Sequence, residues 1–580
     1  MKMKSPKCPA NPIAQRSFLV GILVGCSYLT PLNARAADFY VATTGSDSNA
    51  GTLAAPFASL QKGADVALAG DTVYIRGGTY SITTPKNSGA GLTFTKSGTS
   101  DTNRIKYWAY QAEIPIFDFT NMVLSTTGYT HGFVVTGSWL HFRGLELRNV
   151  PMNTFSNNAI AANGGGNCIF ELLNLHHNSG TGIFIGKGPG GDLILNCDAH
   201  DNYDATSNQG DGQNADGFGV HYQTSGASTI VRGCRAWWNS DDGYDLINQE
   251  VPVIIENSWA MGNGYIKSGT ARPGSGNGNG FKAGSSKTGI RNVVRGSLAW
   301  KNVAAGFYAN HSSGGNDWFN NTSYNNGTQY NMLASDPDDS SVTIILTGTL
   351  VHKMRNNIGF PNKNTNMGGV DTAFNSWDLT ITPAAGDFVS VMDTDALGPR
   401  QPDGSLPNVD FMKLPKGSKM IDKGTDVGLG FVGAAPDLGA FEYGATSTGG
   451  SAGAGSIGAG GTSAGGGAGP TGGAGRSGSA GASGATSAGG SAPASGTNHA
   501  GAPTAAGAGA PGNGGSASVL AGGPGSPVDA PSVEEKDSSG CGCAVPGKST
   551  SRPMSASALA PLLGALALLR RRRRARARNV

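Results

Sequence analysis

The sequence predicts an all-β fold in which short strands wind into a parallel β-helix. Three observations lead to this prediction: a glycine–aromatic pair that recurs in the middle of the chain, a series of asparagines in step with it, and short β-rich runs before those asparagines, such as Ile230–Val231, Val253–Ile255 and Val293–Val294. Repeats of about 20 to 50 residues indicate stacked units. The runs are too short for helices and lack helical periodicity, so each unit should consist of strands.

The repeated positions share one register. A glycine followed by an apolar residue recurs, and an asparagine precedes each copy; the glycines are Gly182, Gly217, Gly243, Gly280 and Gly306, and the asparagines are Asn178, Asn202, Asn239, Asn263 and Asn302, with Asn326 continuing the series. Asparagine steps of 24 residues alternate with steps of 37 and 39. This alternation indicates coils of constant size with insertions in every second turn. We expect the asparagines to form a structural ladder between coils rather than to take part in catalysis.

The folded module is expected over residues 37–444, and both of its ends resemble those of secreted right-handed β-helix proteins. At the start, the stretches Asp38–Val41 and Gly70–Tyr80 carry the resemblance. It implies a right-handed coil with a capping amphipathic helix over residues 59–69, which covers unpaired edges and apolar side chains at the open end. Residues 408–442 resemble the closing segment of the same proteins, so they are expected to cap the other end of the solenoid.

Residues 1–36 have the plan of a cleaved secretory signal peptide. A basic start is followed by the apolar run Phe18–Val24 and by Ala34–Ala36 before the expected cut. The stretch Leu23–Cys26 also resembles a bacterial lipobox, which would leave a lipidated Cys26 instead. Both alternatives predict a protein that leaves the cytoplasm, either secreted or held at the cell surface.

Beyond the module the composition changes abruptly. Residues 445–540 are dominated by Gly, Ala, Ser, Thr and Pro, which predicts a disordered tether. Residues 541–580 contain Cys541-Gly542-Cys543, an apolar stretch over residues 554–569 and Arg570–Arg574. This order resembles the C-terminal sorting signals of myxobacterial surface proteins, which implies display on the cell envelope. An ordinary transmembrane anchor is the alternative.

The formal net charge of +3 does not describe the module. Twelve basic residues precede position 37 or follow position 569, and without them 30 basic residues face 39 acidic ones. Because phosphate binding needs a basic face, we expect no nucleic-acid partner. We expect a monomer.

Two cysteines occupy equivalent positions in the repeat. Cys197 and Cys234 each lie five residues before a ladder asparagine, so they should stack on neighbouring coils. An oxidising compartment would permit a disulfide between them, but we expect free buried thiols, with the disulfide as the alternative. No Cys–His spacing indicates a zinc site.

Four aspartates and one lysine lie within two residues of the glycines of the glycine–aromatic frame: Asp216, Asp241, Asp242, Asp245 and Lys282. Oxygen-only clusters suit a hard cation, and Ca²⁺ takes about six to eight oxygen ligands. Asp245 and Lys282 each lie two residues after the glycine, so they should stack about 4.8 Å apart on the outer face of adjacent coils. Asp216 and Asp242 each lie one residue before the glycine of their frame copy. Strict alternation of side chains along a strand would turn them inward unless the backbone bends there.

The stretches Asn214–Phe218, Asp241–Asp245 and Asn279–Lys282 resemble polysaccharide lyase family 9, the pectate lyases and their relatives. The likeness spans most of residues 38–444. It implies that the four aspartates bind a catalytic Ca²⁺ and that Lys282 is the base that abstracts a proton. It also implies an acidic polysaccharide substrate, polygalacturonate or a related uronan, cleaved by β-elimination.

Two other functions remain open at this point. A polygalacturonase-type hydrolase would use Asp216, Asp241 and Asp242 as acid and base. A non-catalytic surface adhesin would explain the tether and the anchor.

Other charged residues are weaker candidates. Basic side chains that could bind substrate carboxylates are Lys267, Arg272, Lys287, Arg291 and Lys301, but we favour the simpler interpretation that they are solvated loop charges. His221 and His311 are expected to be turn residues rather than acids or bases.

Overall fold

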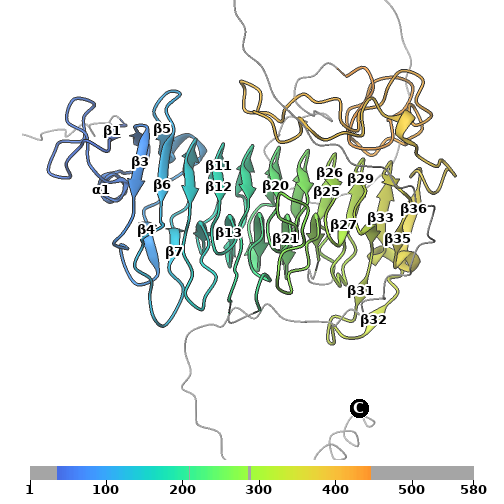
Figure 1. Cartoon of the computed structure of the whole chain (residues 1–580), viewed down its shortest axis with the longest axis horizontal. Coiled ribbons are helices and arrows are strands. Elements are labelled where there is room, and N and C mark those ends of the chain that lie inside the picture. Colours follow the sequence, from blue (N-terminus) through green and yellow to red (C-terminus); the bar gives the residue numbers. More distant parts are fainter. Residues whose placement is uncertain (1–35, 208–209, 285–288, 446–580) are drawn as a thin grey trace, which may run out of the picture. The chain divides into compact units, whose positions relative to one another are not determined.

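The structure, a computed structural model, describes residues 36–207, 210–284 and 289–445. Within them the chain winds into a parallel β-helix, and successive coils add strands to three long sheets (Figure 1). The strands of each long sheet pair in parallel with the coil before and the coil after. The predicted fold class is therefore confirmed for the module.

The first sheet has 12 strands, and its order follows the chain. Its strands are β1 (Asp38–Val41), β2 (Thr72–Ile75), β5 (Ile105–Ala109), β8 (Leu140–Arg143), β11 (Ile169–Glu171), β15 (Leu193–Leu195), β19 (Thr229–Arg232), β22 (Val253–Glu256), β25 (Val293–Arg295), β28 (Asp317–Phe319), β33 (His352–Arg355) and β36 (Val370–Ala373). Three of the β-rich runs seen in the sequence form its strands β19, β22 and β25.

The second sheet has 10 strands and carries the glycine–aromatic frame. Its strands are β4 (Ala90–Phe94), β7 (His131–Val135), β10 (Ile160–Ala162), β13 (Ile183–Ile185), β17 (Phe218–His221), β21 (Tyr244–Ile247), β24 (Phe281–Ala283), β27 (Ala305–Tyr308), β30 (Thr328–Asn331) and β35 (Asn364–Thr365).

The third sheet also has 10 strands. They are β3 (Gly78–Ser81), β6 (Pro115–Asp118), β9 (Glu146–Arg148), β12 (Asn174–His176), β16 (Asp198–His200), β20 (Arg235–Trp237), β23 (Trp259–Met261), β26 (Leu298–Trp300), β29 (Thr322–Tyr324) and β34 (Ile358–Phe360). Two short pairs complete the strands of the described residues: β14 (Gly188–Pro189) with β18 (Gln223–Ser225), and β31 (Ala334–Ser335) with β32 (Thr343–Ile344). Short 3₁₀ turns are η1 (Asp101–Asn103), η2 (Gly348–Leu350), η3 (Met367–Gly369) and η4 (Ala385–Asp387).

The glycine–aromatic frame stacks inside the coil. Rings of consecutive coils lie parallel, with centroid distances of 5.2, 4.5, 5.0 and 5.1 Å along the series Phe218, Tyr244, Phe281, Phe307 and Tyr330. A glycine precedes each of the first four rings, and it has no room for a side chain. At Gly243 a Cβ would lie 2.6 Å from the carbonyl oxygen of Gly280 and 2.8 Å from Asn263 Nδ2. The frame is thus a packing requirement of the coil, and it fixes where the neighbouring carboxylates stand.

The asparagine ladder forms as predicted. The side-chain amide of each asparagine donates to Oδ1 of the next, at 3.0 Å from Asn178 to Asn202 and 2.9 Å from Asn202 to Asn239. The series continues through Asn263 and Asn302 to Asn326 with similar distances. These side chains are buried, and their hydrogen bonds hold the register between coils.

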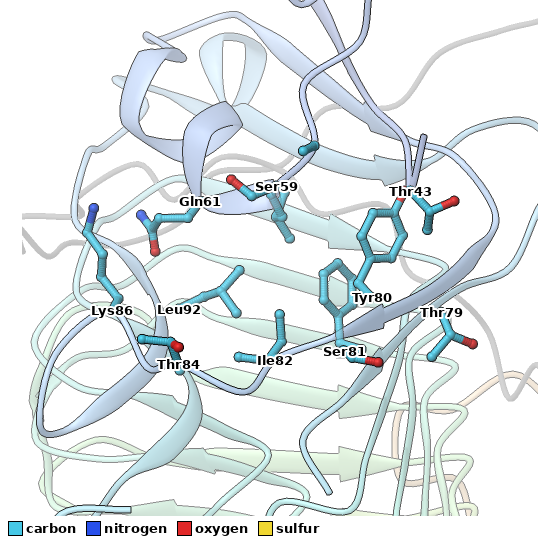
Figure 2. A pocket seen from close by; sticks show the side chains of 14 residues that line it. Thr43, Ser59, Gln61, Thr79, Tyr80, Ser81, Ile82, Thr84, Lys86 and Leu92 are labelled. Carbon is cyan, nitrogen blue, oxygen red and sulfur yellow. The ribbon is translucent and has the colours of Figure 1, made fainter. Parts of the chain in front are cut away.

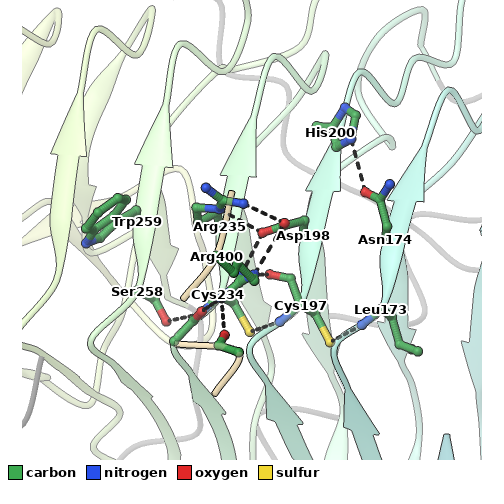
Figure 3. Close-up of polar contacts among 12 residues, drawn as sticks. Leu173, Asn174, Cys197, Asp198, His200, Cys234, Arg235, Ser258, Trp259 and Arg400 are labelled. Atoms are coloured by element: carbon green, nitrogen blue, oxygen red, sulfur yellow. Dashed lines mark hydrogen bonds and ion pairs between the residues drawn. The ribbon is translucent and has the colours of Figure 1, made fainter. Parts of the chain in front are cut away.

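The two stacked cysteines belong to a second column (Figure 3). The Leu173 amide donates to Cys197 Sγ at 3.4 Å, and the Cys197 amide donates to Cys234 Sγ at 3.4 Å. Both cysteines are buried free thiols, so the stacking is confirmed and the disulfide alternative is not realised. In the following coils serine and asparagine take over the same acceptor role, in the order Ser258, Ser297, Asn321, Asn357 and Asn375.

The capping helix is present but shorter than expected. α1 spans Leu60–Val66, and the Ser59 hydroxyl caps it by accepting from the Lys62 amide at 3.1 Å. A Cβ at Gly63 would meet Val73 of β2 at 2.7 Å, so the helix lies close against the first coils (Figure 1).

The closing segment does not lie where it was expected. Residues 408–442 were expected to cap the solenoid, but they lie along the flank of the third sheet (Figure 1). Phe411, for example, contacts Trp300 of β26 with a centroid distance of 5.1 Å. The physical reason is a column of apolar side chains in register on the outer face of this sheet, which needs a cover: Trp237, Met261, Trp300, Tyr324 and Phe360.

The flanking segment as a whole comprises residues 376–445, and a group of charged side chains holds it in place (Figure 3). Arg400 of the segment pairs with Asp198 of β16 at 2.6 Å and donates to the carbonyl oxygens of Cys197 and Gly233, both at 2.9 Å. Arg235 also pairs with Asp198, at 2.7 Å. The segment is therefore anchored by a partly buried carboxylate between two guanidinium groups.

The predicted signal peptide, tether and sorting tail lie outside the described residues, and so does Lys287. Among the helices that the structure does describe, none is long and apolar enough to cross a membrane.

Candidate active site

The five predicted site residues lie at one end of three consecutive strands of the second sheet. Asp216 precedes β17, Asp241 and Asp242 precede β21, Asp245 lies within β21, and Lys282 lies within β24. Asp245 and Lys282 are register partners on adjacent coils, as predicted. Their neighbours Tyr244 and Phe281 point into the core, so by alternation Asp245 and Lys282 point away from it.

The lysine amine lies among the carboxylates. Lys282 Nζ is 2.9 Å from Asp242 Oδ2 and 3.6 Å from Asp245 Oδ1. The backbone amide of Asp242 donates to Asp216 Oδ1 at 3.1 Å, which joins the two coils. The structure thus brings all five residues together.

Neighbouring backbone and side-chain donors fix the carboxylates. The Asn277 amide donates to Asp241 at 2.7 Å, and the Asn279 amide and side chain donate to Asp242 Oδ1 at 2.8 and 2.9 Å. Thr181 donates to Asp216 Oδ2 at 3.1 Å. These contacts pre-organise the carboxylate oxygens before any ligand arrives.

The carboxylates are more buried than the sequence suggested. They were expected on the solenoid surface, yet none of the five residues is more than 8% exposed. One reason is the insertion before Gly280, which reaches the cluster through Asn277. This insertion also packs on the insertion before Asp216, where the Ser275 amide donates to the carbonyl of Asp211 at 2.8 Å.

The position of Asp216 and Asp242 relative to their strands explains which way they face. Both residues precede their strands instead of lying within them, so the alternation of a strand does not apply. They therefore share the cluster with Asp245.

The lysine is held in its charged form by its neighbours. Burial lowers the pKa of Lys282, but the surrounding carboxylates, led by Asp242, raise it and prevail, so its pKa stands well above the usual value. For Asp245, burial raises the pKa, but Lys282 and His221 outweigh it, so the net shift is downward. Asp245 and Lys282 therefore form a charged pair.

The remaining aspartates resist ionising together. Burial and the neighbouring carboxylates raise the pKa values of Asp216 and Asp241 well above the usual range. Burial also raises the pKa of Asp242, against the opposing effect of Lys282. The aspartates outnumber the one lysine that neutralises them, and this imbalance favours a bound cation.

The donor set fits a hard divalent cation. Carboxylate oxygens of Asp216, Asp241 and Asp242 all lie within 4.8 Å of one another. Asp245 stands beside this trio, joined to it through Lys282. An all-oxygen set of this kind suits Ca²⁺.

Sequence reasoning undervalued one residue of the site. His221 was expected to be a turn residue, but it is the last residue of β17, is buried, and has its Nε2 3.3 Å from Asp245 Oδ2. The repeat in the sequence does not mark this contact, because His221 and Asp245 are not register partners: His221 pairs with Ile247, and Asp245 pairs with Gly219.

Several basic candidates are engaged in structural contacts instead. Arg291 pairs with Asp317 at 2.5 Å, and Lys301 pairs with Asp393 at 2.9 Å. Arg272 donates to the carbonyl of Trp238 at 2.6 Å, and Lys267 lies over the Trp238 ring. His311 contacts Ser335.

A separate pocket lies beside the capping helix, far along the chain from the carboxylates (Figure 2). It has a volume of about 400 Å³, and hydroxyl side chains such as Thr43 and Ser59 line it together with Gln61 and Lys86. No carboxylate, histidine or cysteine lines this pocket, so it lacks the side chains that would hold a metal ion.

Comparison with known proteins agrees with this geometry. Residues 39–366 match the family model described as the Pel9A-like, right-handed β-helix region. Pectate lyase L of Dickeya chrysanthemi is 36% identical over 405 residues, which cover 70% of this chain and 90% of that protein. Pectate lyase PEL9 of Emericella nidulans is 30% identical, over 67% of this chain and 95% of that protein.

Solved structures extend the comparison. The crystal structure of pectate lyase Pel9A matches with a TM-score of 0.60 and 34% identity, covering 70% of this chain and 97% of that one. A rhamnogalacturonan lyase matches with a TM-score of 0.58 and 32% identity, covering 65% and 96%.

The solenoid, its carboxylate and lysine cluster and these relatives define a polysaccharide lyase. This result favours the lyase over the hydrolase and the adhesin. The chain belongs to the Pel9A-like family of right-handed β-helix proteins.

Proposed function

We propose that the chain is a calcium-dependent lyase that cleaves polygalacturonate by β-elimination, with Lys282 as the base. The observation that carries the proposal is the position of the Lys282 amine, 2.9 Å from Asp242 within a buried group of carboxylates. Relatives named pectate lyases support the choice of substrate.

The reaction needs a base placed beside the uronate ring. The neutral amine of Lys282 accepts the C5 proton, the C5 electron pair forms the C4–C5 double bond, and the C4–O bond breaks. The departing glycosidic oxygen takes a proton from water. The product carries a 4,5-unsaturated end. A positioned base of this kind typically contributes about 10² to 10⁴-fold in rate.

The cluster of Asp216, Asp241, Asp242 and Asp245 would hold the calcium ion. When bound, the ion stabilises the negative charge that develops on the uronate, and it shares the carboxylates with Lys282, which lowers the pKa of the lysine. Asp242 and Asp245 then orient the amine from two sides.

Ultraviolet absorbance of the unsaturated product tests the proposal on purified polygalacturonate. We expect absorbance to rise in Ca²⁺, to stop with a chelator, and to return with Ca²⁺ better than with Mg²⁺, which demands stricter octahedral geometry. Reducing ends without ultraviolet absorbance, or full turnover in chelator, would contradict it.

Rhamnogalacturonan is a second candidate substrate. It is favoured by the similarity to a rhamnogalacturonan lyase, whose TM-score and identity nearly equal those of Pel9A. A panel of both polymers, assayed at equal enzyme and calcium concentrations, distinguishes the two.

We also propose that the protein acts outside the cytoplasm. The support is the signal-like start of the sequence together with its tether and arginine-rich tail. Fractionation of producing cells, with antibodies against the module, tests this. Module found only in the cytoplasm would refute it.

A further inference from the structure

His221, Asp245 and Lys282 form a row of polar side chains across three adjacent coils. His221 Nε2 lies 3.3 Å from Asp245 Oδ2, and Asp245 Oδ1 lies 3.6 Å from Lys282 Nζ. The two oxygens of one carboxylate are thus divided between the histidine and the lysine. The side chains of His221 and Asp245 are only 7% and 4% exposed, so water contributes little to their orientation.

The surroundings of His221 hold its ring in this place. The register partner of Asp245 on the previous coil is Gly219. A Cβ at Gly219 would lie at ordinary contact distance, 3.4 Å, from both His221 Nε2 and the Phe184 ring, so residue 219, the Phe184 ring and the His221 ring are direct neighbours. Phe184 contacts the ring edge to face, with a centroid distance of 4.9 Å.

We propose that His221 is a positioning residue: its Nε2–H binds one oxygen of Asp245 and thereby turns the other oxygen toward the Lys282 amine. The inference deepens the proposed function and rests on it. The chemistry follows from the general behaviour of carboxylates at reacting or metal-binding sites. A hydrogen bond to a carboxylate outside the reacting centre fixes its direction, and removing such a partner typically costs about 10 to 100-fold in activity or metal affinity.

A second histidine of the chain provides a matched control. His176 of β12 has its Nε2 3.3 Å from Glu146 Oε1, the same distance as in the His221 pair. This pair lies on the third sheet and not on the second. It shares the chemistry of His221 but is remote from Lys282 in the register of the coils.

Two substitutions separate positioning from packing. His221→Phe keeps an aromatic ring against Phe184 but removes the nitrogen that faces Asp245. His221→Gln keeps an N–H donor but fills less of the space. If His221 only packs, the phenylalanine variant should be the more active of the two. If His221 positions Asp245, the glutamine variant should be the more active.

The experiment measures kcat, KM and the calcium concentration for half-maximal activity on polygalacturonate, with Tm as a check of folding. We expect His221→Phe to lose about 10 to 100-fold in kcat with KM changed less than kcat, His221→Gln to recover part of the loss, and His176→Phe to match wild type. Wild-type kcat in His221→Phe, or greater activity in His221→Phe than in His221→Gln, would overturn the inference.

Two further arms keep the test decisive. If His221→Phe is unfolded at the assay temperature, His221→Leu takes its place against His221→Gln. Absence of lyase activity in the wild type, or full activity in Lys282→Ala, refutes the proposed function itself. Activity that is lost in Lys282→Ala but unchanged in His221→Phe refutes only the role of His221.

Discussion

Lys282, which we propose as the base, has carboxylate neighbours that stabilise its charged form. Burial lowers the pKa of Lys282, but the carboxylates raise it by more, because the lysine is their counter-charge. Its reactivity must therefore depend on what else occupies the cluster. Substitution of the lysine should therefore affect turnover, whereas substitution of an aspartate should also affect calcium binding.

Replacing Lys282 should remove chemistry without removing calcium binding. We expect Lys282→Ala to lose about 10² to 10⁴-fold in turnover, and Lys282→Arg to rescue poorly because arginine stays protonated. Calorimetry with Ca²⁺ should show that the alanine variant still binds the ion. Loss of calcium binding together with turnover would instead make the lysine a structural support of the site.

Asp192 predicts a pH dependence of stability that is unrelated to catalysis. Its carboxyl accepts from the Cys168 amide at 2.7 Å, and burial raises its pKa to about 7. In later coils Asn292 and Asn316 accept in the same way from the backbone amides of preceding coils. An uncharged acceptor therefore suits these equivalent positions, which Asp192, Asn292 and Asn316 occupy.

The direction of the effect follows from proton binding. Between about pH 4 and pH 7 the folded state keeps the Asp192 proton while the unfolded state has lost it, so stability falls as pH rises through this range. Asp192→Asn should flatten the fall. At pH 8 we expect the variant to gain up to about 4 kcal/mol over wild type, and almost nothing at pH 4. Urea unfolding at both pH values measures this, with exposed Asp338→Asn as control.

At the scale of one coil, the glycine of the frame is the position with least tolerance. A Cβ at Gly243 would approach the Gly280 carbonyl oxygen to 2.6 Å, whereas at Gly128 there is nothing within 4 Å. We expect Gly243→Ala to cost about 1 to 3 kcal/mol, and Gly128→Ala to be nearly neutral. Thermal unfolding compares the two. Equal Tm values would show that the coil relaxes around the new methyl group.

The same coil shows what a sequence can and cannot predict. The asparagine ladder and the pairing of Asp245 with Lys282 were predictable because both follow from a repeat that the sequence displays. The contact between His221 and Asp245 was not, because it depends on the direction of the His221 ring and the two residues are not register partners. The burial of the carboxylates also escaped prediction, since the insertions carry no repeat.

At the scale of the whole module, the flanking segment is the part that the sequence misplaced. Its composition marks it as an end of the domain, but only the register of Trp237, Trp300 and Phe360 shows that the third sheet needs a cover. Side chains on consecutive strands become one surface only after the coils are aligned.

Arg400 offers a test of how firmly this segment is held. Its guanidinium pairs with Asp198 at 2.6 Å, and the two side chains are 12% and 16% exposed. Breaking a fully buried pair typically costs about 3 to 5 kcal/mol. We expect the loss of stability in Arg400→Ala to lie toward the lower end of this range, because Arg235 still contacts Asp198. Limited proteolysis should cut residues 376–445 faster, and Tm should fall.

The control for Arg400 is a pair inside the same segment. Lys419 pairs with Asp387 at 3.0 Å, and the lysine side chain is 47% exposed. Lys419→Ala should cost about 0 to 1 kcal/mol. If both variants are cut at the wild-type rate, the apolar contacts alone hold the segment.

The ladder of asparagines has a consequence for how this enzyme can diversify. Asn202 and Asn239 are 37 residues apart, and Asn178 and Asn202 only 24, yet the two steps have nearly the same hydrogen-bond length. The distance between stacked asparagines is therefore independent of the number of residues between them in the chain. The insertion between Asn202 and Asp216 can become longer or shorter while the distance from Asp245 to Lys282 stays unchanged. The insertions can therefore vary in length during evolution without moving Asp245 away from Lys282.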